Sequence, residues 1–85
     1  MKIRQVQYLL KVAERGSFTA AVEELYISQS SLSKQIIALE KELGVPLIDR
    51  SRRKIALTQA GETFLRHART LNEIYLAMVV VDVYY

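Results

Sequence analysis

Apolar residues recur at steps of three and four along most of this 85-residue chain, a spacing that limits the fold to packed amphipathic helices. The first stripe predicts a helix over residues 3–15, and its members are Ile3, Val6, Leu9, Leu10 and Ala13. Gly16 ends this helix, because glycine accepts the left-handed conformation that closes many helices. Ser17 then caps a short second helix, predicted over residues 18–25, and Tyr26 and Ile27 form a tight connection.

A third helix is predicted after Ser28, whose hydroxyl can cap it. Its inner stripe recurs at steps of four, three and four and consists of Leu32, Ile36, Leu39 and Leu43. The helix is about fifteen residues long, because Gly44 and Pro46 provide a strong stop signal.

Residues 47–57 lack the helical period and predict a small β-hairpin. We expect a strand near 47–50, a turn at 51–53 and a strand near 54–57, with Ile55 and Leu57 facing inward. Thr58 caps a fourth, long helix whose apolar members include Ala60, Phe64, Ala68, Leu71, Tyr75 and Met78. The β-branched and aromatic run that starts at Val79 weakens helix propensity, so this helix is predicted to end at about Val81.

Composition excludes several classes of site. The chain has no cysteine and one histidine, so it predicts no disulfide, no zinc site and no other metal or cofactor. Three scattered glycines form no phosphate loop, so the chain is not expected to be an enzyme. The N-terminus does not resemble a signal peptide, and no apolar run is long enough to cross a bilayer, so a cytoplasmic location is expected.

Positive charge is concentrated in the middle third of the chain. Residues 28–58 account for a net charge of +3, which equals the net charge of the whole chain. The outward face of the third helix is polar and weakly basic, with Gln29, Ser30, Ser31, Ser33 and Lys34. Glutamine can pair with the adenine edge, and serine and lysine can contact bases or phosphates. Two helices with a tight connection and such a face suit the major groove of DNA, although a solvated polar face explains the same residues equally well.

The predicted hairpin turn is strongly basic, with four cations in five residues: Arg50, Arg52, Arg53 and Lys54. Such a wing could reach the DNA backbone or the narrow minor groove, which favours arginine. In isolation a charge run is usually solvated. Its position between two strands, directly after the helix with the polar face, favours contact with DNA.

These segments together resemble the LysR-type transcriptional regulators, over residues 3–69 without a gap. The matching runs include Gly16-Ser17-Phe18-Thr19-Ala20-Ala21, Ile27 to Ile36, Leu43-Gly44-Val45-Pro46-Leu47 and Leu57-Thr58-Gln59-Ala60-Gly61. The resemblance implies a mainly α fold: a winged helix-turn-helix domain of three helices and a hairpin over residues 1–58, followed by a linker and dimerisation helix over residues 59–85. It also implies an effector-binding domain that is missing here, so the chain looks like a fragment of a longer regulator or a truncated relative.

By position, the resemblance places Ser28, Gln29, Ser33 and Lys34 toward the groove and Arg53 on the wing. The chain departs from the family at three sites. Ser30 stands where proline is common, Ile48 where phenylalanine is common, and Lys34 where arginine is common. Lysine lacks the bidentate geometry of arginine, which puts guanine-specific reading at Lys34 in doubt.

The far end of the fourth helix needs a partner, because its apolar residues lie too far along to reach the core of so small a domain. We expect an antiparallel homodimer through Leu71, Ile74, Tyr75 and Met78, with monomeric exposure as the alternative and a tetramer open for the full-length protein. His67 is expected to be a surface residue rather than a switch.

The function that these features predict is sequence-specific binding of double-stranded DNA by a dimer that regulates transcription. A small-molecule effector would act only through the missing domain. The alternative is a winged-helix module that binds another protein, with the basic turn merely solvated.

Overall fold

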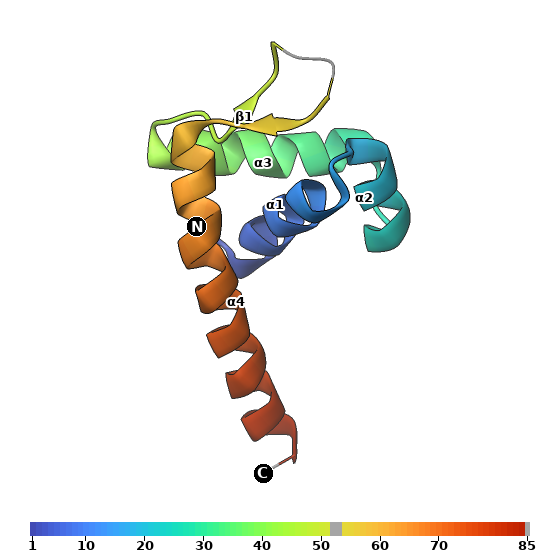
Figure 1. Cartoon of the computed structure of the whole chain (residues 1–85). Helices are drawn as coiled ribbons and strands as arrows, with labels where there is room; N and C mark the ends of the chain where they lie inside the picture. The colour runs from blue at the N-terminus through green and yellow to red at the C-terminus, as the bar shows by residue number, and fades with distance from the viewer. Residues whose placement is uncertain (52–53, 85) are drawn as a thin grey trace.

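A computed structural model of the chain describes residues 1–51 and 54–84, with side chains described through Val80. It confirms the predicted order of three helices, a hairpin and a fourth helix (Figure 1). The elements are α1 (Ile3–Arg15), α2 (Phe18–Leu25), α3 (Gln29–Leu43), β1 (Ile48–Asp49), β2 (Ala56–Leu57) and α4 (Gln59–Tyr84).

The helix boundaries follow from local capping, as predicted. The Ser17 hydroxyl accepts from the Ala20 amide at 3.2 Å, and the Ser28 hydroxyl accepts from the Ser31 amide at 3.1 Å. Gly16 and Gly44 close α1 and α3 with φ of +68° and +74°. The connection between α2 and α3 is tight because Tyr26 also adopts the left-handed conformation, which few non-glycine residues do.

The core lies where α1 and α3 meet, closed by α2, the start of the wing and the first half of α4. Its fully buried members are Val6, Leu9, Val12, Ala21, Leu32, Ile36 and Leu39. Leu47, Ile48, Leu65 and Ala68 complete it and are almost fully buried. Leu43 was expected in this core, and that prediction is wrong because it is 40% exposed. It is the last residue of α3 and lines an open groove with Val45 and Phe64 instead.

The wing is shorter than predicted. Its strands are two residues each, paired Ile48 with Leu57 and Asp49 with Ala56 in antiparallel register. The pairing stops after Asp49 because the Asp49 carboxylate accepts hydrogen bonds from the amide and the hydroxyl of Ser51, which turns the chain. Ile55 and Leu57 pack against the core, as the alternation predicted.

Helix α4 is one continuous element of 26 residues. It ends at Tyr84, so the predicted end near Val81 is three residues too early. The segment has no glycine or proline after Gly61, and β-branched residues lower helix propensity by only a few tenths of a kcal/mol each. The first half packs on the bundle, where the Gln7 amide donates to Asn72 at 3.0 Å, and the second half projects away from it (Figure 1).

Among residues 1–51 and 54–84, none of the helices combines the length and the apolar character of a membrane-spanning segment.

A surface ion network joins α1 to α2. The Glu24 carboxylate accepts from Arg15 Nε at 2.6 Å and from Lys11 Nζ at 3.0 Å. These two hydrogen bonds lower the pKa of Glu24 from 4.5 to about 2. The ion network between the two helices therefore depends on an ionised Glu24, whereas their apolar contact in the core does not.

We predict that acid weakens this contact over a defined range. Because the folded pKa is depressed, the contribution of Glu24 to stability is fully present above pH 4.5 and is lost as the pH falls toward 2. Glu24→Gln should remove this part of the pH dependence, whereas Glu23→Gln, an exposed neighbour on α2, should leave it in place. NMR titration of the side-chain carboxyl carbons measures the pKa, and a value for Glu24 near 4.5 would contradict the prediction.

Candidate nucleic-acid interface

The first turn of α3 presents a cluster of serine hydroxyls. The Ser28 hydroxyl lies 2.9 Å from the Ser31 hydroxyl and 3.2 Å from the Ser30 hydroxyl, and it also accepts from the Ser31 amide. All three residues are exposed. The cluster surrounds the positive end of the helix dipole, a position that suits an anionic group.

The outward face of α3 offers free polar groups. Gln29 and Lys34 are exposed, and within the described part of the chain their side chains have no hydrogen-bond or ion-pair partner. Ser33, on the same face, is half-buried. The Gln29 amide and the Lys34 ammonium can therefore bind an external partner without first breaking a contact within the described part of the chain.

The opposite face of α3 fixes which way these groups point. Leu32, Ile36 and Leu39 are fully buried, so any rotation of the helix would expose them. The Gln35 side chain adds a polar tie, because its carbonyl oxygen accepts from Gln5 Nε2 of α1 at 3.2 Å. The predicted groove-facing residues of α3 therefore lie on one outward surface, which is held in place from behind.

The wing residues are placed differently from one another. Lys54 is exposed, and Arg52 and Arg53 lie outside the described residues. Arg50 was predicted to face DNA, but its guanidinium is paired with Glu40, with Nη1 3.0 Å from Oε1 and 3.2 Å from Oε2. Of the two described wing cations, Lys54 is the one whose charge is left unpaired.

Sequence reasoning missed two buried polar residues behind this surface. Glu40 is 9% exposed and Gln5 is 8% exposed, and both have hydrogen-bond partners. A signal for Glu40 was available, because it follows Ile36 by four residues and therefore lies on the inward side of α3.

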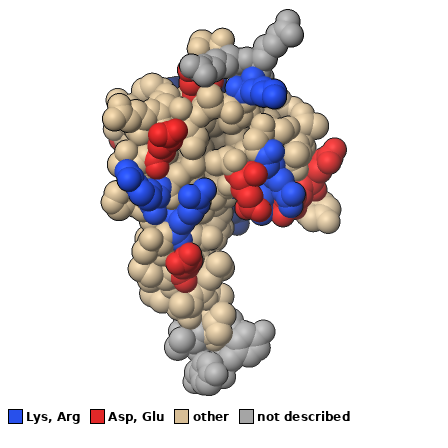
Figure 2. All heavy atoms as spheres, viewed as in Figure 1, with Lys and Arg blue, Asp and Glu red and all other residues tan. Residues whose placement is uncertain are grey.

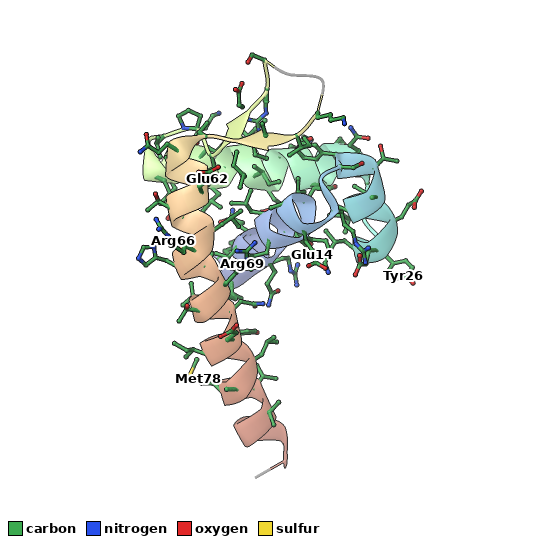
Figure 3. The ribbon with its side chains drawn as sticks, in the orientation of Figure 1. Glu14, Tyr26, Glu62, Arg66, Arg69 and Met78 are labelled. Carbon is green, nitrogen blue, oxygen red and sulfur yellow. The ribbon has the colours of Figure 1, made fainter. Side chains whose placement is uncertain are left out.

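Helix α4 separates an apolar face from a charged one. Leu71, Ile74 and Met78 are 41%, 53% and 57% exposed, and Tyr75 is half-buried. The charged face carries Glu62, Arg66, Arg69 and Glu73, which form a band down α4 (Figure 2). Figure 3 shows Met78 and Arg69 pointing to opposite sides of the helix. Sequence reasoning did not single out Leu76, Val79 and Val80, which are also exposed.

His67 is exposed, as expected of a surface residue, and its Nδ1 lies 2.9 Å from the Thr63 carbonyl oxygen. It lies on the apolar side of α4, between Phe64 and Leu71 at steps of three and four.

Comparison with known proteins identifies relatives over most of the chain. The profile of the bacterial regulatory helix-turn-helix proteins, lysR family, matches residues 3–62. The transcriptional regulator TcbR of Pseudomonas sp. (strain P51) is 46% identical over 74 residues, which cover 87% of this chain and 25% of TcbR. The Hca operon transcriptional activator HcaR of Escherichia coli (strain K12) is 49% identical over 73 residues, which cover 86% of this chain and 25% of HcaR. The chain thus spans about a quarter of the length of these relatives.

Solved structures extend the similarity to the whole fold. The DNA-binding domain of BenM, in complex with catB site 1 DNA, superposes with a TM-score of 0.91 at 38% identity, covering 96% of this chain and 92% of that one. The DNA-binding domain of CbnR, also in complex with DNA, gives a TM-score of 0.88 at 41% identity, covering 96% and 94%. The chain described here therefore belongs to the lysR family of bacterial regulatory helix-turn-helix proteins and has the winged helix-turn-helix fold of that family's DNA-binding domains.

Proposed function

We propose that this chain binds double-stranded DNA with sequence preference and serves as the DNA-binding part of a transcription regulator. The observation that carries the proposal is the outward face of α3. Among the described residues its Gln29 amide and Lys34 ammonium have no partner, a buried stripe holds them in place, and the exposed Lys54 lies on the wing that follows. Family membership supports it, as does the close similarity to two domains solved as DNA complexes. The expectation of no enzymatic reaction agrees with a family of regulators.

The residues divide between base reading and phosphate binding. Gln29 can pair with both edge atoms of adenine, and Lys34 can reach guanine or a phosphate oxygen. The serine hydroxyls at the start of α3 suit a backbone phosphate, because they lie at the positive end of the helix. Lys54, with Arg52 and Arg53, would contact the DNA backbone or the minor groove beside the site read by α3.

The proposal is tested by selecting preferred duplexes from a random pool and measuring their binding by fluorescence anisotropy at several salt concentrations. Arg52→Ala with Arg53→Ala should weaken binding by about tenfold or more and reduce the salt slope by about 2. The matched control removes the same two charges from the charged face of α4, with Arg66→Ala and Arg69→Ala, and should change little. If the wild-type chain and the wing variant are equally inert, the protein-binding module is the better interpretation.

We further infer that two copies pair through α4 in antiparallel fashion. Apolar residues follow steps of four, three, four, three and four along one side of the helix, with His67 as the one polar member: Ala60, Phe64, His67, Leu71, Ile74 and Met78. This is the spacing of helices that pack side by side. Leu71, Ile74 and Met78 are about half exposed in the single chain, so a second copy would cover a face that water now contacts.

Ile74→Glu is expected to dissociate this dimer. Losing the burial of one isoleucine in each copy removes about 3 kcal/mol, which raises the dimer dissociation constant about 100-fold or more. Arg69→Glu introduces the same side chain on the side of α4 opposite Met78 and should leave the dimer intact. Sedimentation velocity at micromolar concentration measures both, and a monomeric wild-type chain would count against the pairing.

A further inference from the structure

We propose that Glu40 and Arg50 form a clamp that holds the wing at a fixed position relative to the recognition helix α3, so that Arg50 acts on DNA binding through Glu40 and not through a phosphate of its own. The effect of the clamp on affinity rests on the proposed DNA-binding function, whereas the clamp itself is a contact within the chain and does not.

The clamp is made by one carboxylate that receives three groups from the start of the wing. Glu40 Oε2 accepts from the Leu47 amide at 2.7 Å, from the Ile48 amide at 3.2 Å and from Arg50 Nη1 at 3.2 Å. Its other oxygen lies 3.0 Å from the same Arg50 nitrogen. Glu40 therefore ties α3 to the beginning of β1 and to the residue directly after β1.

Burial makes these bonds strong constraints. The Glu40 side chain is 10% exposed, so its charge is compensated by protein donors rather than by bulk water. Removing the Glu40 carboxylate would leave the buried Leu47 and Ile48 amides without an acceptor, which is costly.

The wing needs such a tie because its own pairing is minimal. Strands β1 and β2 share two residue pairs, and an isolated two-stranded ribbon of that length has little stability. At the other side of its base, the Thr58 amide donates to the Leu47 carbonyl at 3.0 Å, and the Thr58 hydroxyl donates to the Pro46 carbonyl at 2.7 Å. The wing base is therefore held by α3 through Glu40 and by the start of α4 through Thr58.

The position of the wing matters because recognition requires two surfaces at once. The groove-facing side chains belong to the first half of α3, whereas Glu40 belongs to its second half. Helix α3 therefore has two roles: it carries Gln29 and Lys34, and through Glu40 it also supports the wing. If the tie were loosened, the base of the wing that carries the exposed Lys54 would have to be ordered on binding, at a cost in affinity.

A double-mutant cycle on the full chain separates this role from a direct phosphate contact. We would measure the affinity of Glu40→Gln, Arg50→Ala and the double variant for a selected duplex. Each single change should weaken binding about tenfold, and the double variant should also lose about tenfold rather than a hundredfold. The salt slope of Arg50→Ala should stay that of the wild type, whereas loss of a phosphate contact would lower it by about 0.9.

Glu42→Gln is the matched control, because Glu42 is an exposed carboxylate on the same helix that pairs with the N-terminal amine. It should not change affinity. Additive losses, or a salt slope lowered in Arg50→Ala, would overturn the proposal and return Arg50 to the DNA-contact set.

Amide hydrogen exchange tests the clamp without DNA. The Leu47 and Ile48 amides should exchange faster in Glu40→Ala, which removes their acceptor, while the Leu9 and Val12 amides in the core keep their wild-type rates. Unchanged exchange at Leu47 and Ile48 would refute the clamp even if DNA binds. A wild-type chain that binds no duplex would instead refute the proposed function, and the exchange result would then decide the clamp by itself.

Discussion

Replacing Gly61 with alanine is expected to lower the melting temperature by about 5–15 °C, even though alanine is the better helix former by about 1 kcal/mol. A methyl group at this position of α4 would overlap the Leu47 carbonyl oxygen and lie 3.0 Å from the carbonyl carbon. Both are backbone atoms that cannot turn aside, and the same oxygen accepts the Thr58 amide at the base of the wing. Overpacking at such a site costs about 2–3 kcal/mol.

Thermal denaturation followed by circular dichroism measures this effect. Thr70→Ala is the control on the same helix, because Thr70 is exposed and its replacement tests helix propensity alone. Thr70→Ala should leave the melting temperature unchanged or raise it slightly. A Gly61→Ala protein as stable as the wild type would mean that α4 and the Leu47 backbone do not approach as closely as described.

Gln29→Ala is expected to change which sequences are bound, whereas Lys54→Ala should weaken all of them. Gln29 is exposed on the outward face of α3 and has no partner among the described residues, so in the proposed complex its loss would remove discrimination at one base pair, worth about 1–3 kcal/mol. Lys54 is an exposed wing cation, and its loss should lower the salt slope by about 1 with little change in base preference.

The measurement compares a selected duplex with its single-base-pair variants at several salt concentrations. In Gln29→Ala, one variant position should bind as well as the selected duplex, and the other positions should keep their penalties. Equal loss on every duplex would contradict the base-reading role of Gln29. Lys41→Ala, an exposed cation in the second half of α3, controls for the loss of one charge.

Much of the fold could be predicted because its boundaries are set by neighbours in sequence. Ser17 and Ser28 cap helices with amides three residues away, and Gly16 and Gly44 end helices by their own backbone conformation. All the residues that determine such a helix boundary lie within a few positions of it, so the boundary can be read from the local sequence. The end of α4 could not be predicted in this way, because no breaker follows Val79 and the small helix propensities of single residues do not mark an end.

The residues of the candidate site could be predicted only where their exposure follows from the apolar stripe on the other side of the same helix. Gln29 and Lys34 face outward because the inner stripe of α3 faces inward, and that stripe can be read from spacing alone. The pairing of Arg50 with Glu40 could not be read in this way, since the two residues are ten apart and meet only after the chain reverses at Gly44. Sequence spacing identified Arg50 as a cation of the wing, but it could not show whether Arg50 would pair with a DNA phosphate or with the Glu40 carboxylate.

The undivided course of α4 has a mechanical consequence. The same helix is embedded in the bundle at Leu65 and Ala68 and carries the exposed Ile74 and Met78 farther along, without a glycine or proline hinge between them. A helix of this length behaves as a stiff rod of about 39 Å. In the proposed pair, the angle at which two such rods cross would therefore set the separation of the two wings, and a small change of that angle at the far end would be transmitted to the DNA-facing surface.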